Sequence, residues 1–281
     1  MAGNRKPLRV LGCQSLVPDF SSLAQRDRHV SELCDRIFKY LSEQTPVDLV
    51  VLPELVTIPY SKETLKRLPL FAETLSGTST KTFIELSQKI NSSILFGLPY
   101  ESGGQFFISQ VLVDPRAGVV EIYSKMHLCH YGASCEKDFF ERGDKLTTFE
   151  LCGWKVAPLI CYDIRFPEMA RSLVLEHGVD FLIHAAAYYR DESFATWPHF
   201  AVTRAMENQT FLLSLNRAGS DYGESMFCPP WVDDDHPIVR FDQFREEFRV
   251  MELNSEAITQ ARERYTFLID RHLKYSVYGD N

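Results

Sequence analysis

Short, almost wholly apolar runs alternate along this chain with longer segments in which apolar residues recur at helical spacing. Residues 8–13 form the first run. The next run, residues 48–52, is apolar at nearly every position, which is typical of a strand covered on both faces. Between them, one helical face carries the apolar residues Leu23, Val30, Leu33, Cys34, Ile37, Phe38 and Leu41. This alternation predicts an α/β protein with strands buried between helices.

The same pattern continues toward the C-terminus. We predict strands at residues 94–98, 106–113, 119–123, 155–160, 180–184, 210–215 and 248–253, and helices at residues 80–90, 167–177, 197–207 and from 255 onward. Pro167 suits the first turn of its helix, and Gly178 suits the position just past its end. Ser255 is expected to cap the last helix, with Glu256 in its first turn. No repeat or linker divides the chain, so residues 1–281 are expected to form a single domain with a mixed sheet system.

Composition excludes several classes of protein. The chain has 281 residues, of which 45% are hydrophobic and 24% charged, so it can build a large core. Its net charge of −8, without long blocks of one sign, argues against a nucleic-acid partner. No apolar stretch approaches the roughly 18 residues of a membrane helix, and no signal peptide is predicted. The seven scattered cysteines are expected to be free thiols in a reducing compartment, which predicts a cytoplasmic protein.

Three polar residues each directly follow an apolar strand. They are Glu54, Lys125 and Cys161. Ligands of open α/β sheets bind outside the carboxyl ends of the strands, so a carboxylate, an ammonium and a thiol could meet at one edge. Together they provide a base, a cation and a nucleophile for attack on a carbonyl or nitrile carbon. Taken singly, each has a plainer interpretation as a buried thiol, a turn carboxylate or a solvated lysine.

Longer motifs surround these three residues: Val51-Leu-Pro-Glu54-Leu55, Tyr123-Ser-Lys125-Met-His-Leu128, Leu159-Ile-Cys161-Tyr-Asp-Ile-Arg-Phe-Pro-Glu168, Arg204-Ala-Met-Glu-Asn-Gln209 and Leu215-Asn-Arg-Ala-Gly219. In this order and at this spacing they resemble the nitrilase superfamily of carbon–nitrogen hydrolases, from about residue 8 to residue 275. The resemblance places the catalytic glutamate, lysine and cysteine of the family on Glu54, Lys125 and Cys161. A second glutamate of the family, seven residues before Gly143, falls on Glu136.

The resemblance also implies a fold, an activity and an assembly. The fold is a four-layer α-β-β-α sandwich. The activity is that of an amidase without a cofactor, acting on a small linear amide. The sequence motif around Cys161 is most similar to that of the branch containing the ω-amidases and the deaminated-glutathione amidases. Hydrolysis of N-carbamoyl compounds or nitriles stays open, as does a non-catalytic binding role, against which the intact Glu54, Lys125 and Cys161 argue.

The three residues together suggest a mechanism. A thiol with a pKa near 8.5 is weakly ionised at neutral pH, and a nearby lysine is expected to favour the thiolate. We expect Cys161 to attack the amide carbonyl while Glu54 acts as general base. Lys125 and the backbone N–H of Tyr162 would stabilise the oxyanion. Glu54 would then protonate the leaving amine and activate the water that hydrolyses the thioester. Glu136 is expected to position the lysine or the substrate amide.

Aromatic residues near these motifs are candidates for the substrate pocket. We predict substrate-binding roles for Tyr60, Tyr131, Tyr162, Tyr188 and Arg190, with Tyr189, Phe194 and Trp197 as further wall candidates. Arg190 could receive a substrate carboxylate on its planar fork. Each of the aromatic residues could instead lie in the core or in a subunit interface.

No metal is predicted. The cluster His127, Cys129, His130 and Cys135 matches no common structural zinc spacing, and residues 233–236 are expected to form an acidic surface loop.

A homodimer or higher homo-oligomer is the predicted assembly. Its candidate contact surfaces are the helix side with Met169, Leu173 and Val174, and the aromatic tail over residues 264–278.

The chain also departs from the family pattern at three places. Many members of the family have an asparagine near the position of Ser109, and a proline is frequent among them at the position of His184. Residues 224–230 also differ from the family pattern.

Overall fold

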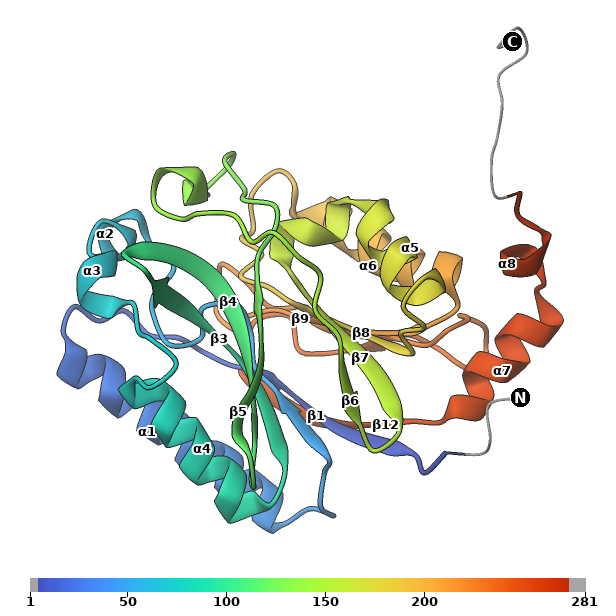
Figure 1. Ribbon diagram of the computed structural model, residues 1–281, viewed down its shortest axis with the longest axis horizontal. Coiled ribbons are helices and arrows are strands. Elements are labelled where there is room, and N and C mark those ends of the chain that lie inside the picture. The colour runs from blue at the N-terminus through green and yellow to red at the C-terminus, as the bar shows by residue number, and fades with distance from the viewer. Residues whose placement is uncertain (1–4, 273–281) are drawn as a thin grey trace, which may run out of the picture.

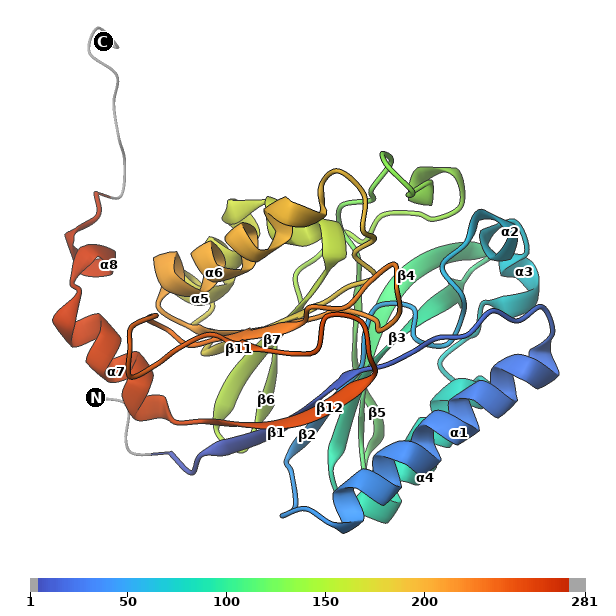
Figure 2. The ribbon, with the colours of Figure 1, turned by 180° about the vertical axis from the view of Figure 1, so that it is seen from behind.

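Two six-stranded sheets pack face to face in the computed structural model, which describes residues 5–272 (Figure 1). Helices cover the outer face of each sheet, so the described chain forms four layers, α-β-β-α (Figure 2). The four-layer sandwich expected from the motifs is therefore confirmed.

The first sheet combines a parallel centre with antiparallel edges. Its order is β12 (Glu247–Leu253), β1 (Leu8–Gln14), β2 (Leu49–Val51), β3 (Ser93–Ser102), β4 (Gln105–Asp114) and β5 (Gly118–Ser124). Strands β1, β2 and β3 run parallel, whereas β12, β4 and β5 pair antiparallel. The ends of β2 and β5 lead directly into Glu54 and Lys125.

The second sheet has the same organisation. Its order is β11 (Val239–Arg240), β10 (Met226–Cys228), β9 (Phe211–Leu215), β8 (Phe181–Ala185), β7 (Trp154–Ile160) and β6 (Phe149–Leu151). Strands β7, β8 and β9 are parallel, and the end of β7 leads into Cys161. Both sheets are therefore mixed, as the sequence predicts.

The helices divide between the two outer faces. On the first sheet lie α1 (Leu23–Ser42) and α4 (Thr78–Ile90), and on the second lie α5 (Pro167–Leu175) and α6 (Trp197–Asn208). The other helices are α2 (Lys62–Leu65), α3 (Leu68–Phe71), α7 (Ser255–Arg264) and α8 (Phe267–Asp270), with 3₁₀ turns η1 (Glu136–Asp138), η2 (Cys161–Arg165) and η3 (Phe194–Thr196). Each long helix contributes its apolar stripe to the core.

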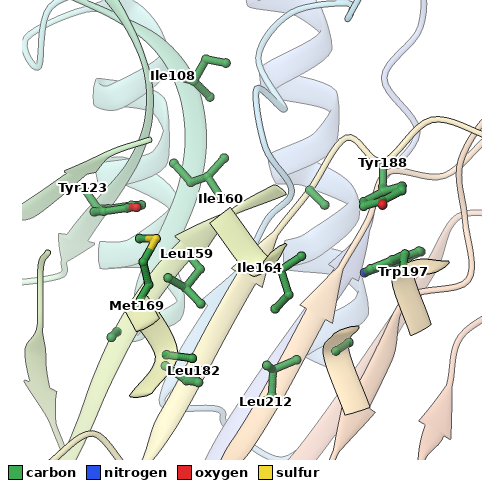
Figure 3. Packing of buried hydrophobic residues seen from close by; sticks show 14 of the residues in the cluster. Ile108, Tyr123, Leu159, Ile160, Ile164, Met169, Leu182, Tyr188, Trp197 and Leu212 are labelled. Carbon is green, nitrogen blue, oxygen red and sulfur yellow. The ribbon is translucent and has the colours of Figure 1, made fainter. Parts of the chain in front are cut away.

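The hydrophobic core consists of three layers of packing. One cluster fills the space between the sheets, one lies under α1 and α4, and one lies between the second sheet and α5 and α6. Figure 3 shows part of the third cluster, including Ile160 and Ile164. These two buried residues are close to Cys161 in sequence, so the turn that carries the thiol is rooted in the core.

Most predicted elements lie where the periodicity placed them, with two kinds of difference. The short elements α2, α3, β6, β10 and β11 were not predicted, because two to four residues carry too little periodicity. The cap of α7 is Asn254 rather than Ser255: its side chain accepts the Glu256 N–H at 3.0 Å, and Ser255 is the first helical residue.

Candidate active site

The predicted carboxylates and the predicted ammonium meet in the interior. Lys125 Nζ donates to Glu54 Oε1 at 2.7 Å and to Glu136 Oε1 at 2.7 Å. All three side chains are fully buried. Glu54 and Lys125 therefore meet as their places after two apolar strands predict, and Glu136 joins them from η1.

The Glu54 turn is held from both sides. On one side, the Arg217 guanidinium donates to the carbonyls of Glu54, Leu55 and Ile58. On the other, a Cβ at Gly97 of β3 would lie 2.5 Å from Leu55 N, so only glycine permits this close approach. Leu55 itself has a left-handed φ of 48°, which costs about 1–3 kcal/mol in a residue with a side chain. These contacts fix the direction of the carboxylate.

Glu136 lies among hydrogen-bond donors from its own segment and from the loop that carries Tyr60. The Tyr60 hydroxyl donates to Glu136 Oε1 at 2.8 Å, and the Cys129 N–H donates to Oε2 at 2.8 Å. Gly143 packs so closely on the backbone before Lys125 that a Cβ would lie 2.1 Å from the Ser124 carbonyl oxygen. Its N–H donates to the Lys125 carbonyl at 2.8 Å. This contact explains the glutamate-to-glycine spacing noted in the sequence.

Mutual charge governs ionisation within this cluster. Burial alone would lower the pKa of Lys125, but Glu136 and Glu54 outweigh it and hold that pKa well above its usual value. Burial raises the pKa of Glu136 while Lys125 opposes the change. Lys125 therefore stays charged.

Cys161 opens η2 in a left-handed conformation with a φ of 45°. The Asp163 carboxylate supports this turn: its Oδ2 accepts the Ile160 N–H at 3.1 Å and the Tyr123 hydroxyl at 2.7 Å. Its Oδ1 accepts the His127 N–H at 3.0 Å. Asp163 was not among the predicted site residues, although it lies inside the quoted Cys-Tyr-Asp motif.

Three effects compete for the ionisation of the thiol. Burial, followed by the negative charge of Glu54, raises the pKa of Cys161 well above its usual value. Lys125 favours the thiolate, as predicted, but it is outweighed by burial and Glu54. Attack must be accompanied by proton transfer to a nearby base.

An open cleft with about 380 Å³ of space leads to Cys161 and Glu136. Its lining residues are Tyr60, Cys129, Tyr131, Ser134, Glu136, Cys161, Tyr162, Ala187, Tyr188, Tyr189, Asp191 and Ser193. The four tyrosines to which we gave substrate-binding roles all line this cleft, as does Tyr189. Asp191 and Ser193 were missed because isolated polar loop residues carry no sequence signal.

Arg190, by contrast, does not line the cleft. Its guanidinium donates to the Tyr222 carbonyl at 2.7 Å and to Glu224 Oε1 at 2.9 Å. The structure therefore contradicts the prediction that Arg190 receives a substrate carboxylate, because its planar fork is already occupied. Phe194 and Trp197 are also absent from the cleft lining and pack against the ring of Tyr188.

The residues once considered as metal ligands have other partners. His127 contacts Asp163 Oδ1 at 3.0 Å through Nδ1 and stacks on Phe166 at 3.6 Å. Within residues 5–272, no group of three or more His, Cys, Asp or Glu side chains is arranged to hold a metal ion. Every helix in the same range is too short or too polar to cross a membrane.

A layered α-β-β-α sandwich with a thiol, a carboxylate and an ammonium after its strands, and a second carboxylate from a 3₁₀ turn, defines a class of hydrolase that works by nucleophilic attack. The sequence model of the carbon-nitrogen hydrolase family matches residues 10–263, and the chain belongs to that family. It is an enzyme of the nitrilase superfamily.

Individual relatives agree with this assignment. An (R)-stereoselective amidase of Pseudomonas is 32% identical over 82% of this chain and 81% of its own length. The ω-amidase YafV of Escherichia coli is 27% identical over 78% of this chain and 82% of its own. The structure of Nit3 from Saccharomyces cerevisiae superposes with a TM-score of 0.80 at 23% identity, over 93% of this chain and 95% of that one.

Proposed function

We propose that this protein hydrolyses the C–N bond of a small linear amide to an acid and ammonia through a thioester on Cys161. The observation that carries the proposal is the fully buried cluster of Glu54, Lys125 and Glu136 beside a cleft that opens onto Cys161. Burying three charges is costly, so a cluster of this kind needs a reason beyond stability. The amidase and ω-amidase relatives support an amide as the substrate.

Each residue then has a defined part in the reaction. Glu54 takes the Cys161 proton as the sulfur attacks the carbonyl carbon, because the thiol is neutral at rest. Lys125 and the Tyr162 N–H stabilise the oxyanion. Glu54 returns the proton to the leaving nitrogen, ammonia departs, and Glu54 activates the water that cleaves the thioester. Glu136 positions Lys125 by accepting a hydrogen bond from its ammonium group.

The test is release of ammonia from a panel of linear amides, N-carbamoyl compounds and nitriles. We expect turnover of amides above the other two classes, and no turnover of any class by Cys161→Ala. The matched control is Cys129→Ala, which removes another thiol of the cleft. Equal amide turnover by wild type and Cys161→Ala would refute the proposed role of Cys161, and turnover of nitriles alone would refute the amide substrate.

We also propose a cytoplasmic, single-domain protein that forms a homodimer. All seven cysteines are free thiols, which supports a reducing compartment. Met169, Leu173 and Val174 are buried within the described chain, so this helix side is not a free contact surface. Helix α8 exposes Phe267 and Ile269, whereas residues 273–278 of the predicted tail surface lie outside the described residues.

Assembly is tested by light scattering. Deleting the residues after Arg264 is expected to lower both the oligomeric mass and the activity, because α8 and the tail are removed together. A fully active full-length monomer of 32.3 kDa at micromolar concentration would contradict the dimer.

A further inference from the structure

A second polar network reaches Cys161 through its backbone, beneath helix α6. His184 on β8 is fully buried, and its Nε2 lies 2.8 Å from the Cys161 carbonyl oxygen. Its Nδ1 lies 2.6 Å from the hydroxyl of Ser214, the residue paired with it on β9. The Trp197 indole N–H, at the start of α6, donates to the same hydroxyl at 2.7 Å.

Only one arrangement of hydrogens satisfies this network. A carbonyl oxygen can only accept, so Nε2 of the imidazole carries the hydrogen and donates to the Cys161 carbonyl. Nδ1 of the neutral ring then accepts from the Ser214 hydroxyl, whose oxygen accepts from the Trp197 indole N–H. Burial lowers the pKa of His184 to about 4, which keeps the ring neutral.

The outer end of the network is held rigidly. The Trp197 indole stacks on the Tyr188 ring with centroids 5.4 Å apart and planes 13° from parallel. Figure 3 shows the two rings side by side next to Ile164. Packing in the core therefore fixes the orientation of the Trp197 N–H. This hydrogen bond orients the Ser214 hydroxyl, which in turn orients the His184 ring.

The inner end of the network contacts Cys161, whose backbone conformation is strained. Cys161 has the left-handed φ of 45°, which side chains rarely adopt, so its turn must be held by its surroundings. Three residues further along, the N–H of Ala187 donates to Glu54 Oε2 at 2.8 Å. Residues 184–187 thus hold the backbone of the proposed nucleophile and also the carboxylate of the proposed base.

We propose that His184 is a positioning residue for the amidase reaction: its Nε2–H holds the Cys161 carbonyl and so sets the distance between the thiol and Glu54. The proposal rests on the proposed role of Cys161 as nucleophile. His184 does not touch the substrate, so its effect is on the rate of attack and not on substrate binding.

The test compares two substitutions of His184 with a control on the same strand. His184→Met keeps much of the volume but has no donor, whereas the amide nitrogen of His184→Gln can reach the region of Nε2. Ile183→Ala shortens an equally buried side chain that packs between the two sheets. All variants are made in a Cys152→Ser background, because Cys152 is exposed and would consume a thiol reagent.

Each variant is characterised by kcat, KM, the melting temperature and the rate at which iodoacetamide modifies Cys161, read by mass spectrometry. We expect His184→Met to lose about 10- to 100-fold in kcat and in the modification rate, with KM nearly unchanged, because a small misplacement of a reacting atom is this costly. His184→Gln should recover most of both rates. Ile183→Ala should lower the melting temperature but keep kcat.

Two results would overturn the inference. One is a His184→Met enzyme with the kcat and modification rate of the parent. The other is an equal loss of kcat in Ile183→Ala, which would assign the effect to general stability. Failure of the proposed function is recognised separately by an active Cys161→Ala enzyme, and the modification rate of Cys161 in the His184 variants tests the contact in either case.

Discussion

The buried charged cluster beside the cleft, which we call the floor, and the more exposed part of the cleft lining, which we call the rim, are built in opposite ways. The floor consists of Glu54, Lys125 and Glu136, all fully buried, with hydrogen bonds to all four carboxylate oxygens. The rim consists of Tyr131, Tyr162, Asp191 and Ser193, none of them buried, with Tyr131 37% exposed. Buried charges tolerate no lost partner, whereas exposed rings and hydroxyls exchange partners with water. Substitutions in the floor should therefore abolish nearly all activity, whereas substitutions in the rim should change activity by small amounts.

Lys125→Met should have the largest effect, because it removes the only cation of the floor. We expect a loss of at least about 1,000-fold in kcat from the missing oxyanion stabilisation. Removing one partner of a buried ion pair should also cost about 3–5 kcal/mol of unfolding free energy. Steady-state kinetics and urea denaturation measure the two effects. Substantial kcat in this variant would contradict the role of Lys125.

The stability loss in Lys125→Met should depend on pH with a definite sign. Without the ammonium, burial and the charge of Glu54 raise the pKa of Glu136 in the folded state. A group whose pKa is raised by folding stabilises the protein at low pH, and that contribution is lost as the pH rises through the folded pKa. The deficit relative to wild type should therefore be smaller at pH 5 than at pH 8.

Glu54→Gln should come next, with kcat lowered by about 100- to 10,000-fold and the fold retained. The amide oxygen can still accept the Ala187 N–H, but the side chain can no longer carry the proton. With a reactive ester substrate, which needs no protonated leaving group, the thioester should accumulate. Intact-mass spectrometry would detect the adduct. Full activity in this variant would falsify the assignment of the base.

His184 predicts a stability effect of intermediate size. Its pKa is about 4 in the folded protein because burial disfavours the charged ring, whereas an unfolded histidine titrates near 6.5. The unfolded chain therefore binds an extra proton as the pH falls from about 6.5 to about 4, and wild type should lose up to about 3 kcal/mol there. His184→Gln should lose correspondingly less in urea denaturation over this range. His29, whose pKa burial also lowers, is present in both proteins and cancels.

The smallest effects should come from the rim and from beyond it. Tyr131→Phe keeps the ring and removes one partly exposed hydroxyl, so KM should change by about two- to tenfold with kcat nearly constant. Arg190→Ala should leave KM unchanged even for an amide that carries a carboxylate, because that guanidinium already binds Glu224. A rim variant that abolishes kcat would break the contrast between floor and rim.

The strands and the long helices could be predicted because they depend on residues that are neighbours in the chain. The periodicity predicted α1 and the central strands, and the placement of Glu54 and Lys125 after two of those strands predicted that they would meet, whereas Glu136 was expected only from the family resemblance. The sequence also contains a pattern that matches the His184 network. Phe181-Leu-Ile-His184-Ala185 and Phe211-Leu-Leu-Ser214-Leu215 are apolar strands with one polar residue at the same position.

The sequence by itself thus determined the alternating α/β pattern, the family and the chemical types gathered at the strand ends. Only the tertiary structure decided that the Cys161 thiol is neutral at rest, that Arg190 binds Glu224 instead of facing the cleft, and that His184 holds the Cys161 carbonyl. The reason is physical. Helical and strand periodicity follow from local backbone geometry, whereas a pKa and a hydrogen-bond partner depend on burial and on groups far away in the chain.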